Sequence, residues 1–115
     1  MLKEDNFINI EKELSILIAK FIKNASGRGP TDTSIVITDN YVILKFWEYL
    51  LPYELDLAKS EQGYYDVKFN RLKWIETRKD MIIEIITHKL GKQVLEFYYD
   101  LNPIENVGVM ILYTN

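Results

Sequence analysis

The segment 41–49 constrains the fold most, because the strand that it predicts is apolar on both sides. The segment is rich in β-branched and aromatic residues, and Asp39-Asn40 fits a two-residue turn from a first strand over 34–38. One side of the second strand carries Val42, Leu44, Phe46 and Glu48, and the other carries Tyr41, Ile43, Lys45, Trp47 and Tyr49. A strand with one face in water would alternate apolar and polar residues instead.

A second hairpin near the C-terminus repeats this pattern. It combines a strand over 93–101, a turn over 102–106 and a strand over 107–113, and in its first strand Leu95, Phe97 and Tyr99 alternate with Val94, Glu96 and Tyr98. Because monomers rarely leave a large apolar patch in water, we expect a second copy to cover the spare face, and hence a homodimer. The alternative is that two helices of the chain itself cover one face each.

A first helix is predicted over 6–23. Its apolar residues step by three and four and form one stripe, namely Phe7, Ile10, Leu14, Leu17 and Phe21. Gly27 suits a left-handed cap after this helix, and Pro30 forbids its continuation.

Two further helices are predicted between the hairpins. Pro52 opens a short helix over 52–59, since proline suits a first helical turn. Gly63 then separates this helix from a long one over 64–90, which ends at Gly91. We therefore predict an α+β fold of order α-β-β-α-α-β-β, in which two hairpins form a four-stranded antiparallel sheet packed with helices. Strand order stays open.

Length and composition fit one globular domain over 1–115. The chain is 48% hydrophobic and 27% charged, which excludes wholesale disorder. It has no cysteine and one histidine, so it lacks the ligands of thiolate and His-rich metal sites, and no carboxylate spacing resembles a calcium loop. With no acid–base pair or nucleophile elbow either, we expect no catalytic residue, metal or cofactor.

The charge and hydropathy of the chain point to a cytoplasmic protein. No apolar run approaches the roughly 18 residues that cross a bilayer, so we expect no transmembrane segment. The N-terminal residues lack the basic start and apolar centre of a signal peptide. A net charge of −3 argues against a protein that mainly binds nucleic acid.

Four residues are candidates for binding an anion or a partner. Arg71, Trp74 and Arg78 lie on one stripe of the long helix, where an arginine that leaves water must be paired. Their expected partners are internal carboxylates, with Glu54, Asp56 and Asp100 as candidates; the functional alternative is an anionic ligand or a partner's carboxylates, with Trp74 stacking between the arginines. Arg28 lies in Gly27-Arg28-Gly29-Pro30, which fits a helix cap better than an anion cradle.

Several short strings occur along the chain in a characteristic order. They are Gly27-Arg28-Gly29-Pro30, the hairpin 34–49, Pro52-Tyr53-Glu54, Gly63, Arg71, Arg78, Gly91, Val94 and Asp100-Leu101-Asn102-Pro103. In this order they resemble a bacterial family of small proteins, long of unknown function, that is named after the accessory protein MpsC of a sodium-translocating, membrane-potential-generating system. Two positions depart from the family: Leu51 stands where members tend to have threonine, and Asn102 where they tend to have aspartate.

This resemblance implies a cytoplasmic auxiliary or regulatory protein near an ion or bicarbonate transport system, without established catalysis. Some relatives contain two such domains in tandem, which fits a domain that needs another copy as cover. Our first hypothesis is therefore a non-enzymatic interaction protein, a homodimer that docks on a membrane transport component. The alternative is a sensor of a small anionic ligand that uses the arginines of the long helix, and a nucleic-acid binder ranks third.

Overall fold

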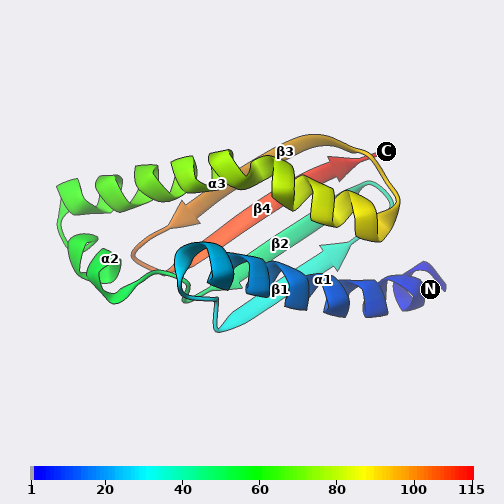
Figure 1. Ribbon diagram of the computed structural model, residues 1–115, viewed down its shortest axis with the longest axis horizontal. Coiled ribbons are helices and arrows are strands. Elements are labelled where there is room, and N and C mark those ends of the chain that lie inside the picture. Colours follow the sequence, from blue (N-terminus) through cyan, green and yellow to red (C-terminus); the bar gives the residue numbers. More distant parts are fainter. Residues whose placement is uncertain (1) are drawn as a thin grey trace.

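The computed structural model describes residues 2–115, with side chains from Phe7 onward, and confirms the predicted order of elements (Figure 1). The elements are α1 (Leu2–Ser26), β1 (Asp32–Ile37), β2 (Tyr41–Trp47), α2 (Pro52–Leu57), α3 (Glu61–Leu90), β3 (Val94–Asn102) and β4 (Val107–Thr114). Gly27 adopts the left-handed conformation expected after α1, and Gly91, which was expected to end α3, adopts a left-handed conformation as well. The two predicted hairpins are therefore present, and both long helices end where glycine was expected to end them.

The four strands form one antiparallel sheet of order β1-β2-β4-β3. The two hairpins meet along β2 and β4, so β4 lies between β2 and β3. The register aligns Ile43 of β2 with Val36 on one side and Ile111 on the other, and Ile111 in turn with Tyr98 of β3. This strand order was the part of the topology that the sequence left open.

Both long helices pack on the same face of the sheet, which we call the covered face (Figure 1). The apolar stripes of α1 and α3 join the inward side chains of the strands in one core, which includes Leu14, Ile18, Ile75, Ile82, Ile86, Val42, Leu44, Phe46, Met110 and Leu112. Gly108 contributes by its lack of a side chain, since an added Cβ would lie 2.5 Å from the Phe46 ring. The alternative in which each helix covers its own face is wrong.

The role predicted for Gly63 is wrong as well. Gly63 does not separate the two helices but lies inside the first turn of α3, where its N–H donates to the Oγ of Ser60 at 3.0 Å. A Cβ on Gly63 would lie 1.8 Å from the carbonyl oxygen of Leu57. Glycine is therefore required here because the end of α2 comes so close to the start of α3.

The end of β2 also differs from the prediction. Glu48 adopts a left-handed conformation (φ 56°), so β2 ends at Trp47 and the chain leaves the sheet. Asn106 holds this bend: its carbonyl accepts from the N–H of Glu48 at 2.8 Å, and its side chain accepts from the N–H groups of Tyr49 and Leu50. Tyr49 consequently lies in the core, although the alternation of the strand placed it on the opposite side.

Candidate functional site

The side of the sheet that faces away from the helices carries an apolar surface, which we call the open face. Its residues are Ser34, Val36, Tyr41, Ile43, Lys45, Trp47, Glu96, Tyr98, Asp100, Asn102, Val107, Val109, Ile111 and Tyr113. Within residues 2–115, no helix packs on this side. Val36, Ile43 and Tyr98 remain 48%, 38% and 56% exposed, respectively. An apolar sheet face of this extent is typical of a surface that another molecule covers.

The central row of the open face crosses all four strands. Val36, Ile43, Ile111 and Tyr98 follow one another from β1 to β3 in this row. In a neighbouring row, the rings of Tyr41 and Tyr113 lie 5.3 Å apart between centroids. Contacts between side chains that lie directly opposite one another on adjacent strands stabilise a sheet. Here the same side chains form its apolar surface.

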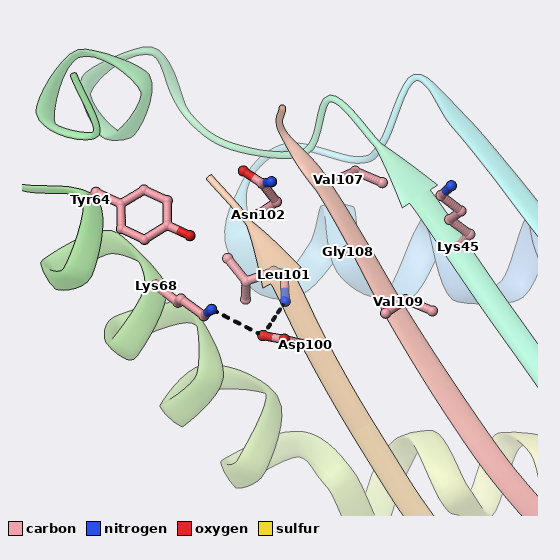
Figure 2. Close-up of a pocket in the computed structure, with 9 residues that line it drawn as sticks. All are labelled: Lys45, Tyr64, Lys68, Asp100, Leu101, Asn102, Val107, Gly108 and Val109. Atoms are coloured by element: carbon pink, nitrogen blue, oxygen red, sulfur yellow. Dashed lines mark hydrogen bonds and ion pairs between the residues drawn. The ribbon is translucent and has the colours of Figure 1, made fainter. Parts of the chain in front are cut away.

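The next row carries a cation and an anion. It runs through Ser34, Lys45, Val109 and Asp100, so that Lys45 and Asp100 lie on either side of Val109. The Nζ of Lys45 lies 5.2 Å from the centroid of the Trp47 ring. One carboxylate oxygen of Asp100 pairs with the Nζ of Lys68 on α3 at 3.5 Å (Figure 2). Both charged groups are exposed, so both remain accessible to a partner.

A shallow hollow of about 270 Å³ lies at this end of the open face (Figure 2). Residues of β2, β3 and β4 line it, together with Tyr64 and Lys68, which reach it from α3 past the edge of β3. The hollow contains cations, a carboxylate and an amide but no cluster of convergent donors. Its shape and chemistry therefore fit a contact surface better than an enclosed ligand site.

Arg71, the first candidate residue, is buried and fully paired. Its Nε donates to one oxygen of Glu54 at 2.8 Å and its terminal nitrogen donates to the other at 2.5 Å, and the two residues are 5% and 6% exposed. Glu54 also accepts from the N–H of Leu51 at 2.9 Å. The guanidinium lies 5.4 Å from the ring of Tyr49, whose pKa is raised by burial. The partner of Arg71 is thus an internal carboxylate, as expected. Of the three carboxylates considered, it is Glu54.

Arg78 and Trp74 lie together, and Arg28 lies elsewhere. The guanidinium of Arg78 is 4.7 Å from the Trp74 ring, which Arg71 approaches to 5.7 Å, so one indole lies between the two arginines as predicted. Arg78 donates to the hydroxyl of Thr77, and no carboxylate among residues 7–115 forms an ion pair with it. The Nε of Arg28 donates to the carbonyl of Glu48 at 3.3 Å. Anion binding by Arg28, or by Arg78 with Trp74, stays a prediction.

Two features of the site were not predicted from the sequence. Lys45 and Asp100 were not predicted to share a row, because that requires the strand order β1-β2-β4-β3. Asn106 holds the bend at which the chain leaves β2, and the sequence predicted only that it lies in a turn. The two-sided apolar pattern of β2 was the one signal that identified the open face.

The comparison with protein families decides the identity. The family model described as Na⁺-translocating membrane potential-generating system (MpsC) matches residues 8–115. This chain belongs to the MpsC family. A relative from Bacillus subtilis (strain 168), named uncharacterized protein YbcI, is 27% identical over 103 residues, which cover 90% of this chain and 83% of the relative.

One further comparison and one property of the helices complete this description. No solved structure matches this MpsC-family chain, so its sheet order and its open face have no experimental counterpart among the comparisons. Across residues 2–115, none of the helices combines the length and the apolar character that a membrane span requires. The family description names a Na⁺-translocating, membrane-potential-generating system.

Proposed function

We propose that this chain is a non-enzymatic accessory or regulatory protein of a Na⁺-translocating, membrane-potential-generating system, and that it acts in the cytoplasm as a homodimer. The family description supports the link to the system. The open face supports the proposed interaction. Ile43 and Tyr98 are exposed there, and covering them with another molecule would lower the free energy of the system. Each Å² of apolar surface removed from water contributes about 25 cal/mol.

The polar groups of the chain fit an interaction role too. Glu54 neutralises Arg71 inside the protein, so this buried cation is part of the fold and not free to polarise a substrate. Lys45 and Asp100 are accessible, are of opposite sign and lie within a largely apolar surface. Isolated charges in such a setting orient a partner and exclude mismatched ones.

The test measures the membrane potential as a function of external Na⁺ in cells that lack the gene. We expect the Na⁺-dependent component to fall and wild-type protein to restore it. Ile43→Glu, which places a carboxylate in the centre of the open face, should fold but fail to restore it. Ile16→Glu is the matched control, since Ile16 is also an exposed isoleucine but lies on α1.

The outcomes separate the two parts of the proposal. An unchanged Na⁺-dependent potential in the deletion strain would reject the link to the system. Full restoration by Ile43→Glu would show that the open face is not needed. Circular dichroism and thermal melting of both variants confirm that each is folded, so a failure of Ile43→Glu reflects a lost interaction.

A further inference from the structure

The residues of β2 and β3 on the open face are complementary in pairs about β4. Ile43 and Tyr98 flank Ile111 in one row, and Lys45 and Asp100 flank Val109 in the next. The outer rows follow the same rule, with Trp47 and Asn102 on either side of Val107, and Tyr41 and Glu96 on either side of Tyr113. Each row thus sets an apolar group against an apolar one, a cation against an anion, or a hydrogen-bond donor against an acceptor.

From this pairing we infer that two copies of the chain stack their open faces about a two-fold axis that runs along β4. Such an axis lies in the plane of the interface and exchanges β2 with β3 between the copies. Lys45 of each copy then lies opposite Asp100 of the other, and Ile43 lies opposite Tyr98. The inference rests on the proposed homodimer and adds its geometry: β4 packs on β4 at the centre, and two ion pairs flank it.

The charges argue against an axis that runs across the strands. An axis across the strands, through the row of Val109, would place Lys45 opposite Lys45 and Asp100 opposite Asp100. Like charges brought together in a contact that excludes water repel each other strongly, so this stacking is disfavoured. Asp100 keeps one oxygen free for the second copy, because its pair with Lys68 uses the other.

The size of the matched surface suits a weak dimer. An axis along β4 sets three strands of each copy, β2, β4 and β3, against the other copy and leaves β1 outside the contact. Three strands about 4.8 Å apart, with seven or eight residues at about 3.3 Å each, give a face of roughly 14 by 25 Å. Two such faces bury on the order of 700 Å², which is below the roughly 1,200 Å² at which stable interfaces begin. Two twisted sheets pack face to face with their strands within about 30° of each other, as an axis along β4 requires.

The test is a charge swap followed by sedimentation equilibrium. Lys45→Asp and Asp100→Lys each place two like-charge pairs in the dimer, so each should raise the dimer dissociation constant by about tenfold or more. The double variant restores opposite charges across the interface, and its dissociation constant should return to within about threefold of the wild-type value. Lys73→Asp and Asp80→Lys are controls on the exposed side of α3 and should leave association unchanged.

Each outcome decides a separate point. Weakening by both single variants together with recovery in the double variant supports the axis along β4. A wild-type dimer that neither reversal weakens overturns this axis and leaves the proposed homodimer standing. A wild-type chain that remains monomeric into the high micromolar range overturns both the axis and the homodimer, and would leave another protein as the occupant of the open face.

Discussion

The two faces of the sheet differ far more in their environment than in their residues. On the covered face, Leu44 is fully buried beneath α1 and α3, whereas its neighbour Ile43 on the open face remains 38% exposed. Both faces of β2 and β4 carry branched and aromatic side chains. The contribution of such a side chain to stability depends on what covers it, so the same strands contain one complete core and one surface that still lacks its cover.

The charged groups of the two sides show the same contrast. On the helix side, Glu54 and Arg71 form a bidentate pair shielded from water. On the open face, Lys45 and Asp100 are exposed and lie on different strands of one row. A pair that is already desolvated is a fixed part of the fold, whereas exposed charges in an apolar surface add little until a partner arrives.

The largest expected effect comes from breaking the buried pair. Arg71→Met should lower the free energy of unfolding by about 3–5 kcal/mol, because the Glu54 carboxylate would stay buried without its counter-charge. Lys45→Met on the open face should lower it by less than about 1 kcal/mol, since the cation is solvated. Urea denaturation of both variants measures the difference.

A second substitution identifies the cause of the loss at Arg71. Adding Glu54→Gln to Arg71→Met removes the stranded charge and leaves an amide that still accepts from Leu51, so part of the lost stability should return. Similar small losses for Arg71→Met and Lys45→Met would contradict the contrast between the two sides.

The next largest effect compares two neighbours on β2. Leu44→Ala should cost about 2–5 kcal/mol, because it opens a cavity beneath the helices. Ile43→Ala should cost less than about 1 kcal/mol in the dilute monomer, where its side chain is already partly in water. Denaturation at low protein concentration isolates the monomer, and equal losses there would mean that the open face is covered within the chain.

The sequence predicted the elements well because local chemistry decides them. Pro52 in the first turn of α2 and left-handed Gly91 after α3 act within a few residues of their own position. The bend at Glu48 was missed because its cause, Asn106, lies 58 residues further along the chain. Gly63 was misread for a similar reason: its role depends on the approach of Leu57, which the local pattern does not contain.

The candidate site was predictable only in outline. The two-sided apolar pattern of β2 predicted a surface in need of cover, but its location required knowing that α1 and α3 share a face. Among the carboxylates considered for Arg71, the choice of Glu54 follows from the packing of α2 against α3. The row that joins Lys45 to Asp100 depends on strand order, which the residues of one strand do not encode.

The smallest expected effect contrasts two adjacent tyrosines on opposite faces of β3. Tyr98, on the open face, donates to Glu96, and Tyr99, on the covered side, donates to Glu76 of α3. Each hydrogen bond to a carboxylate favours the neutral phenol, which raises the pKa of Tyr98 and raises the pKa of Tyr99 to about 12. Glu76→Gln should lower the pKa of Tyr99 toward 10 and leave Tyr98 unchanged, and Glu96→Gln should do the reverse.

The pH dependence of stability follows from these directions. Because the pKa of Tyr99 is higher in the folded chain than the usual 10, its hydrogen bond contributes stability that is fully present below pH 10 and is lost between pH 10 and about 12. Titration of the tyrosine side-chain carbons by NMR assigns each pKa. A shift of both tyrosines by either substitution would show that the two sides of β3 are electrostatically coupled and that their separation by the sheet is incomplete.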